Sequence, residues 1–189
     1  MKRIAILALQ GAFAEHAAML NRLGAETHYV RSLSDWHLPK DALVIPGGES
    51  TSQLTLLRAQ RLLQPVRTAI LDGLPVFGTC AGLILLARDE DGTPRDGLAT
   101  LDVDVHRNAY GRQIASFHTI GAVDGVGQDV PMTFIRAPFV NAVRSADVQV
   151  LATHESRITA VRQNRQLATA FHPELTDDTR IHEYFLSFL

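Results

Sequence analysis

Two short stretches of the sequence carry side chains that could act together as a nucleophile and its base. The single cysteine, Cys80, lies in a Gly-Thr-Cys-Ala-Gly string, and a His-Pro-Glu string occupies residues 172–174. A thiolate can attack a carbonyl carbon when a histidine carries the proton and a carboxylate orients that histidine. Cys80, His172 and Glu174 are therefore candidates for the catalytic triad of an acyl-transfer enzyme.

The string around Cys80 has the form G-x-C-x-G, the sulfur counterpart of the G-x-S-x-G nucleophile elbow. It separates an apolar stretch that predicts a strand from one that predicts a helix, as such an elbow requires. Glycines suit the cramped turn, and the helix N-terminus would favour the thiolate. The alternative is a buried structural cysteine. The order of strand, turn and helix favours the nucleophile.

His172 and Glu174 follow the last predicted strand. Alternate residues of an extended backbone point to the same side, so we expect the imidazole and the carboxylate to converge. Pro173 would fix its own φ, push His172 toward an extended conformation and leave the imidazole little freedom. A His-Pro-Glu string alone is more typical of a turn or a helix start, and it gains weight from its pairing with Cys80. The other histidines form no ligand-spaced cluster, so no metal site is predicted.

A glycine-rich string, Pro-Gly-Gly-Glu-Ser-Thr at residues 46–51, lies between a predicted strand and a predicted helix. Glycines there let backbone N–H groups approach a ligand closely. A phosphate cradle is the alternative, but the lysine of a P-loop and the G-x-G-x-x-G spacing are missing. In an acyl-transfer site, the amides of Gly48 and Ala81 would form the oxyanion hole.

The predicted elements place these strings at one edge of a parallel sheet. Strands are predicted at residues 3–9, 25–30, 42–45 and 75–78, and helices at 13–23, 51–59 and 65–71. Later strands are predicted at residues 101–105, 114–117, 132–135, 148–152, 157–162 and 167–171, with a helix at 177–189 and a mobile polar loop at 88–97. The alternation predicts an α/β fold, in which ligands bind at the carboxyl ends of the strands.

Length and composition limit the possible classes of protein. A chain of 189 residues fits one domain, 1–189, and its 46% hydrophobic content indicates a folded protein. Its apolar runs are too short for a membrane span, and the N-terminus lacks a signal-peptide cleavage site, so we expect a cytoplasmic protein. A net charge of −2 favours neither nucleic acid nor a membrane surface as a partner.

Three strings together resemble the class I glutamine amidotransferases: residues 46–51, residues 78–87 around Cys80, and Phe-His-Pro-Glu-Leu-Thr at 171–176. Four more strings resemble, within that class, the family of glutaminase subunits of pyridoxal 5′-phosphate synthases. They occupy residues 9–11, 15–16, 107–113 and 134–138. The resemblance covers nearly the whole chain. It departs at Ala115 and His118, which stand where that family commonly has acidic residues.

The resemblance implies a three-layer, flavodoxin-like domain with a mostly parallel central sheet. It implies that Cys80 is the nucleophile, His172 the base and Glu174 the residue that orients the base. The positions that it implies for glutamine binding are Gly47, Gly48, Glu49, Ser50, Arg107, Ile135 and Arg136. Without the resemblance, both arginines would be interpreted as surface residues, although a guanidinium suits the α-carboxylate of an amino acid.

The activity implied is hydrolysis of L-glutamine to L-glutamate and ammonia through a cysteinyl thioester. The ammonia would pass to a synthase subunit within a large ring, twelve copies of each subunit, and no cofactor is expected on this chain. One alternative is a stand-alone cysteine hydrolase of related fold, which the segments around Arg107 and Ile135 disfavour. The other is a regulatory subunit that binds glutamine without turnover, which the intact triad disfavours.

Overall fold

Strands and helices alternate through the first half of the chain. The computed structural model describes residues 1–107 and 116–189. The elements of this half are β1 (Arg3–Leu7), α1 (Phe13–Arg22), β2 (Glu26–Val30), α2 (Leu33–Trp36), β3 (Ala42–Ile45), α3 (Ser50–Ala59), α4 (Leu63–Leu71), β4 (Val76–Thr79) and α5 (Ala81–Leu86). The predicted strands and helices of this half are confirmed, and α2 is an addition that the sequence analysis missed.

Short strands dominate the second half. The elements are β5 (Ala87–Glu90), β6 (Thr93–Pro94), β7 (Leu101–His106), β8 (Ser116–Val123), β9 (Gly127–Ile135), β10 (Phe139–Val143), β11 (Val148–His154), β12 (Arg157–Gln163), β13 (Gln166–Thr169), the 3-10 turn η1 (Pro173–Leu175) and α6 (Arg180–Leu186). Of the predicted strand at 114–117, the first two residues lie outside the described residues. So do residues 108–113 of the string that supported the family resemblance.

One mixed sheet runs through the described part of the molecule. Its strand order is β2-β1-β3-β4-β13-β12-β10-β7-β5-β6, with β11 paired to β12, while β8 and β9 form a separate two-stranded sheet. The strands from β2 to β13 are parallel, whereas β12 and β10 run antiparallel to their neighbours. The predicted α/β class is therefore confirmed, and the second half contains antiparallel hairpins.

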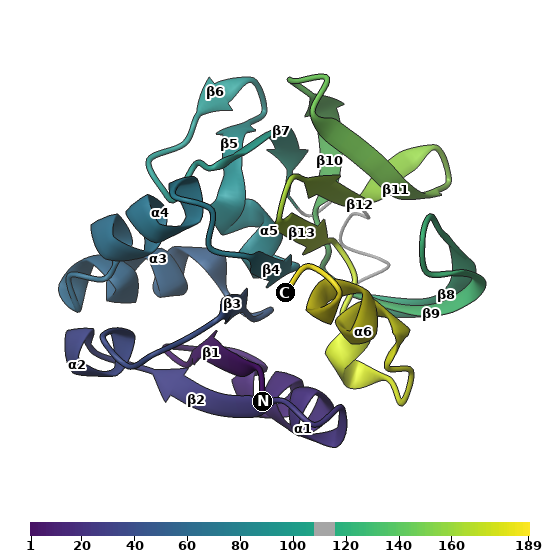
Figure 1. Ribbon diagram of the computed structural model, residues 1–189. Coiled ribbons are helices and arrows are strands. Elements are labelled where there is room, and N and C mark those ends of the chain that lie inside the picture. The colour runs from purple at the N-terminus through teal and green to yellow at the C-terminus, as the bar shows by residue number, and fades with distance from the viewer. Residues whose placement is uncertain (108–115) are drawn as a thin grey trace.

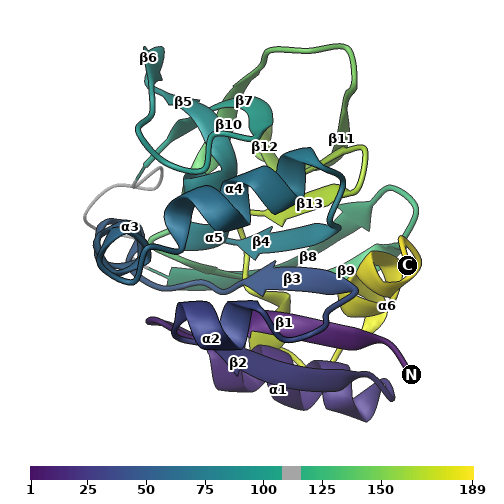
Figure 2. The ribbon, with the colours of Figure 1, turned by 60° about the vertical axis from the view of Figure 1, so that its left-hand side comes forward.

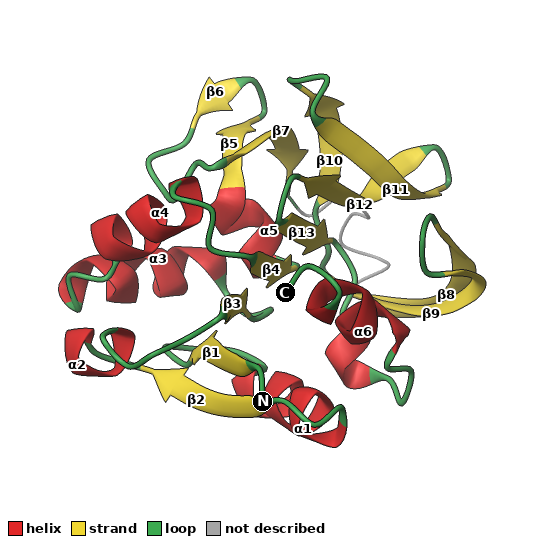
Figure 3. Cartoon of the chain, viewed as in Figure 1, coloured by secondary structure: helices red, strands yellow, loops and turns green. Residues whose placement is uncertain are grey.

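Helices cover both faces of the parallel strands. Figure 1 and Figure 3 show α1 and α6 on one face and α3, α4 and α5 on the other. Strands β3 and β4 are buried along their whole length. They show no alternation of buried and exposed residues, as is typical of parallel strands covered on both faces. This arrangement is the three-layer architecture that the sequence analysis expected.

The carboxyl ends of the parallel strands lie at one edge of the sheet (Figure 2). Register pairs Ile45 with Gly78 and Thr79 with Thr169 across neighbouring strands. The segments that follow these residues contain the glycine-rich string, Cys80 and His172. The sheet therefore brings together three strings that are far apart in the sequence.

The polar segment at 88–97 is not a mobile loop, which corrects the prediction. Residues 87–90 and 93–94 pair as an antiparallel hairpin, and β5 also pairs in parallel with β7. Arg95, whose side chain is only 10% exposed, forms an ion pair with Glu90. Much of the segment is exposed, as its polarity indicated, but its backbone is paired in strands and so is not a loop.

The final helix begins three residues later than predicted. The hydroxyl of Thr176 accepts a hydrogen bond from the Asp178 N–H, and the Asp178 carboxylate accepts one from the Arg180 N–H. These side chains bind the backbone in non-helical conformations and so delay the helix start.

Among residues 1–107 and 116–189, no helix is long and apolar enough to cross a membrane.

Candidate active site

Cys80 lies in a strained turn between β4 and α5. Its backbone has φ 49° and ψ −96°, which a non-glycine residue rarely adopts. The Cys80 N–H donates to the carbonyl of Thr169 over 2.7 Å, which anchors the turn to β13. A β-carbon added at Gly78 would lie 2.7 Å from the carbonyl carbon of Gly82, and one added at Gly82 would lie 2.3 Å from the Ile45 oxygen. The expected need for glycines on both sides of the elbow is confirmed.

His172 and Glu174 meet as the sequence analysis expected, but for a different reason. Nδ1 of His172 lies 2.8 Å from Oε1 of Glu174. The backbone at 173–175 is a 3-10 turn, so the expected extended conformation is wrong. In the turn, Pro173 occupies the first position, where its missing N–H costs nothing. The turn brings the carboxylate back under the imidazole. The backbone N–H of His172 donates to the carbonyl oxygen of Thr133 over 2.8 Å.

The three side chains form a buried set. Burial lowers the pKa of His172, but hydrogen bonds to Cys80 and Glu174 and the charges of both groups outweigh it and raise the pKa to about 10. Burial raises the pKa of Glu174, but His16 and His172 lie against the carboxylate and hold the pKa below its ordinary value. At neutral pH, His172 is therefore an imidazolium beside an ionised Glu174, ready to donate a proton.

A pocket of about 460 Å³ opens over Cys80 and His172. Six of the predicted substrate residues line it, namely Gly48, Glu49, Ser50, Arg107, Ile135 and Arg136. Gly47 does not line it, because it lies against the imidazole: a β-carbon there would be 2.2 Å from Cε1 of His172. The Sγ atom of Cys80 lies 3.9 Å from the carbonyl oxygen of Ile135, at the pocket wall.

Gln10 and Ile84 also line the pocket, and the sequence analysis did not assign them to it. Gln10 follows β1, so the rule that ligands bind at the carboxyl ends of parallel strands could have indicated it. Its side-chain oxygen accepts a hydrogen bond from the Glu49 N–H over 2.7 Å. Ile84 lies one helical turn after Cys80, and its apolar side chain carried no functional signal.

Both signs of charge face the pocket. The Glu49 carboxylate caps α3 by accepting from the N–H groups of Thr51 and Ser52 at 3.1 and 2.7 Å. These bonds, the Ser52 bond most of all, lower the pKa of Glu49. The Arg107 guanidinium lies 3.4 Å from the Glu49 carboxylate. A carboxylate and a guanidinium at this spacing suit the ammonium and carboxylate groups of an amino acid.

Ala81 is the first residue of α5 and is buried directly after Cys80. The first N–H groups of a helix have no partner within the helix, so they are available to an anion.

Among residues 1–107 and 116–189, no group of three or more His, Cys, Asp or Glu side chains is arranged to hold a metal ion.

Comparison with solved structures places this fold among the glutamine amidotransferases. One solved structure, described as a crystal structure of glutamine amidotransferase, is 43% identical with a TM-score of 0.91 and covers 98% of this chain and 97% of its own. The structure of PurLQS from Thermotoga maritima is 15% identical with a TM-score of 0.67 over 99% of this chain and 98% of its own, and it shares the fold alone. The chain is a glutamine amidotransferase.

Within that class, the chain belongs to the SNO glutamine amidotransferase family, whose model matches residues 6–189. A protein of Streptococcus pneumoniae strain CGSP14 named pyridoxal 5′-phosphate synthase subunit PdxT is 52% identical over 187 residues, which cover 97% of this chain and 95% of the relative. The protein of the same name from strain 70585 is 51% identical over 188 residues, with 98% and 96% covered. The expected family is confirmed.

Proposed function

We propose that this chain is the glutaminase subunit of a pyridoxal 5′-phosphate synthase, which hydrolyses L-glutamine and passes the ammonia to a synthase subunit. The names of its relatives support the pathway. The observation that carries the chemistry is the buried set of Cys80, His172 and Glu174, with a 2.8 Å contact between the last two, beneath a pocket of amino-acid size.

The first half-reaction forms a thioester. The Cys80 thiolate attacks the side-chain amide carbon of glutamine, and the carbonyl oxygen becomes an oxyanion held by the amides of Gly48 and Ala81. His172, already protonated, gives its proton to the amide nitrogen as the carbon–nitrogen bond breaks. Ammonia leaves, and a glutamyl thioester remains on Cys80.

The second half-reaction restores the thiolate. Neutral His172 now accepts a proton from a water molecule, whose oxygen attacks the thioester carbon. The carbon–sulfur bond breaks, glutamate leaves, and the cysteine again faces an imidazolium. Glu174 holds Nδ1 of His172 throughout, so that Nε2 carries the moving proton, while the Glu174 charge stabilises the imidazolium.

The pocket walls select the substrate in this proposal. Glu49 contacts the α-ammonium of glutamine, and Arg107 contacts the α-carboxylate, with Arg136 beside it. Gly47, Gly48 and Ser50 form the wall next to the reacting amide, and Ile135 covers the apolar stem of the substrate. The two charged contacts fix one end of glutamine, and the length of the side chain then places its amide at Cys80.

The synthase partner and the place of action complete the proposal. We place the chain in a ring of twelve copies of each subunit, in the cytoplasm, with no cofactor of its own. Enclosure of the ammonia between the subunits prevents its protonation and loss to solvent.

Ammonia release from glutamine tests the proposal. Purified protein is assayed alone and with a pyridoxal 5′-phosphate synthase subunit, and wild type is compared with Cys80→Ala. We expect release that the synthase stimulates and that Cys80→Ala abolishes. Strong release without the synthase would indicate another amidotransferase or a hydrolase. Glutamine binding without release, unchanged in Cys80→Ala, would indicate a regulatory subunit.

A further inference from the structure

A chain of hydrogen-bonding side chains continues behind Glu174, on the side away from the pocket. His16 of α1, Thr79 of β4 and His182 of α6 are each fully buried. Nε2 of His16 lies 3.1 Å from the Thr79 hydroxyl and 3.5 Å from Oε2 of Glu174, and its Nδ1 lies 2.9 Å from Nε2 of His182. The Thr79 hydroxyl donates to Oε1 of Glu174 over 3.4 Å.

His16 and His182 are both neutral. Burial is the main cause that lowers the pKa of each, to about 3 in His182, and the Glu174 charge offsets only part of the effect. The ring of Phe77 packs edge-on against His16 and His182, with centroids 5.7 and 5.5 Å away. A neutral imidazole has one N–H donor and one bare acceptor nitrogen, so each ring must adopt one of two tautomers.

The Glu174 charge selects the tautomers. Oε2 of Glu174 is buried and has no hydrogen-bond partner within normal distance among the described residues, so the nearby Nε2 of His16 is favoured as an N–H donor. Nδ1 of His16 is then an acceptor, which requires Nε2–H on His182. The Nδ1 atom of His182, which also has no partner among the described residues, is left as a bare acceptor.

The opposite assignment is less favourable, because it would point the lone pair of His16 Nε2 at the lone pairs of the carboxylate. It would also leave the buried Oε2 atom of Glu174 without any donor beside it. The Nδ1 atom of His182 has no partner in either assignment, so it does not decide between them. Every donor in the chosen arrangement is instead directed toward the Glu174 carboxylate, from His182 through His16 and Thr79.

We propose that His16 and His182 are positioning residues for the reaction, which fix the Glu174 carboxylate, ionised and correctly rotated, beneath His172. This inference rests on the proposed function only in assigning Glu174 the role of orienting the base. Neither histidine touches the pocket, so each acts through Thr79 and Glu174.

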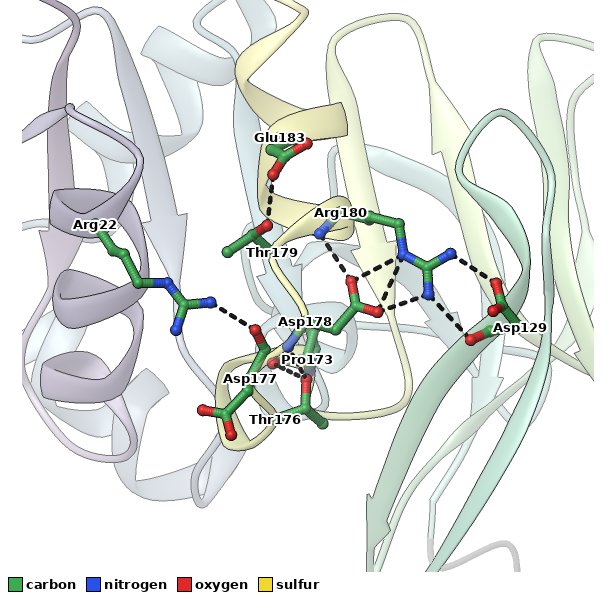
Figure 4. Close-up of polar contacts among 9 residues, drawn as sticks. All are labelled: Arg22, Asp129, Pro173, Thr176, Asp177, Asp178, Thr179, Arg180 and Glu183. Atoms are coloured by element: carbon green, nitrogen blue, oxygen red, sulfur yellow. Dashed lines mark hydrogen bonds and ion pairs between the residues drawn. The ribbon is translucent and has the colours of Figure 1, made fainter.

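The segment between Glu174 and His182 is anchored on both sides, which keeps this chain of donors in register (Figure 4). The Arg22 guanidinium of α1 donates to the carbonyl oxygen of Asp177 over 2.5 Å. On the other side, the Arg180 guanidinium lies 2.7 Å from the carboxylate of Asp129 in β9 and 2.6 Å from that of Asp178. The start of α6 is therefore tied to α1 and to β9, and His182 is held against His16.

The tautomers can be read directly, independently of glutaminase activity. Nitrogen-15 NMR of the full chain at pH 7 is expected to show Nε2–H with bare Nδ1 for His16 and for His182. Single His16→Gln and His182→Gln variants assign the signals, and the exposed His37→Gln serves as the control. A proton on Nδ1 of His182, or an imidazolium in either ring, would overturn the proposal.

A pair of substitutions separates positioning from core filling. His182→Leu removes the donor, whereas His182→Gln carries an amide N–H that reaches the same place. We expect His182→Leu to lower kcat about tenfold at an unchanged KM. The acid limb of the kcat profile should move to higher pH, because the ionised Glu174 carboxylate loses the donors that stabilise it. His182→Gln should restore kcat to within about threefold. Equal kcat values and equal pH profiles in the two variants would overturn the proposal.

Two controls keep these outcomes distinct. His37→Leu changes an exposed histidine and should leave kcat and the profile unchanged. Wild-type protein that releases no ammonia with the synthase would contradict the proposed function, whereas the NMR tautomers decide the positioning chain in either case.

Discussion

The two sides of the Cys80–His172–Glu174 set are built differently. Behind it, His16 and Thr79 are fully buried and contact each other and the Glu174 carboxylate. In front of it, the side chains of Glu49 and Arg107 are 51% and 34% exposed, and their ion pair spans 3.4 Å. The rear is fixed by the packing of α1, β4 and α6, whereas the two charged residues in front lie outside the helices and strands. The proposed mechanism therefore assigns the chemistry to a buried, fixed set and the recognition of the substrate to exposed charges.

The two sides differ in how strongly their charged groups interact. Charges in a dry interior interact strongly, and an unpaired one is costly, whereas water and salt weaken the exposed pair in front. Substitutions behind or within the buried set should therefore reduce kcat. Substitutions among the exposed charges should mainly raise KM. The following predictions test that contrast, from the largest expected effect to the smallest.

The largest effect is expected from His172→Asn. Asparagine can fill part of the space but cannot carry the proton in either half-reaction, so kcat for glutamine should fall by about 10⁴-fold or more. Steady-state ammonia release with the synthase present measures it, and the exposed His37→Asn is the control. A loss below tenfold would show that His172 is not the base.

Gly47→Ala should disturb the same imidazole from the pocket side. The added β-carbon would meet Cε1 of His172 at 2.2 Å, so the ring or the loop must shift. We expect kcat to fall about 100-fold, because a displacement of about 1 Å at a reacting group has that effect. In Gly97→Ala the nearest atom is 3.5 Å away, and activity should be normal. Unchanged kcat in Gly47→Ala would contradict the close packing of His172.

The rear of the site should also make the fold sensitive to acid. Unfolded His182 binds a proton below its ordinary pKa of about 6.5, but folded His182 has a pKa of about 3. Between these values the unfolded chain holds more protons, so stability falls as the pH drops from about 6.5 toward 3. From pH 7 to pH 5, the unfolding equilibrium constant should rise about 20-fold more in wild type than in His182→Gln.

Urea unfolding at the two pH values measures this difference. His37→Gln, an exposed control, should behave as wild type. Equal pH dependence in wild type and His182→Gln would show that His182 is not kept neutral by burial.

The smallest effect is expected at the front of the site, from Arg107→Ala. Loss of the guanidinium removes one partly solvated contact to the substrate, so KM for glutamine should rise about tenfold with kcat nearly unchanged. Arg88→Ala, which removes another half-exposed arginine paired with Asp102, should leave both constants unchanged. A fall in kcat with an unchanged KM would place Arg107 in the chemistry rather than in recognition.

The sequence predicted the parts of the site that depend on local patterns. The elbow follows from two glycines around Cys80, and a β-carbon on either would collide with its neighbours. The pairing of His172 with Glu174 was predicted as well, but from an extended backbone, whereas a 3-10 turn forms it. A proline after the histidine is compatible with both conformations, so the sequence alone could not distinguish them.

Contacts between distant segments could not be predicted in the same way. His16 and His182 are 166 positions apart and meet only because α1 and α6 pack on the same face of the sheet. Strand β10 was missed because Pro138 and the polar Asn141 interrupt its pattern. It pairs with β7 through a bulge and with β12 at a single residue pair. The segment at 88–97 was predicted to be a loop from its polar composition, whereas its backbone pairs as an exposed hairpin and with β7.

Covalent capture of the nucleophile tests the central claim most directly. Wild type and Cys80→Ala, each with the synthase subunit, are treated with an electrophilic analogue of glutamine and examined by intact-mass and peptide mass spectrometry. The account predicts one adduct per wild-type chain, located on Cys80 and prevented by excess glutamine, and none on Cys80→Ala. An adduct at another residue, or glutamine hydrolysis that persists in Cys80→Ala, would contradict the account.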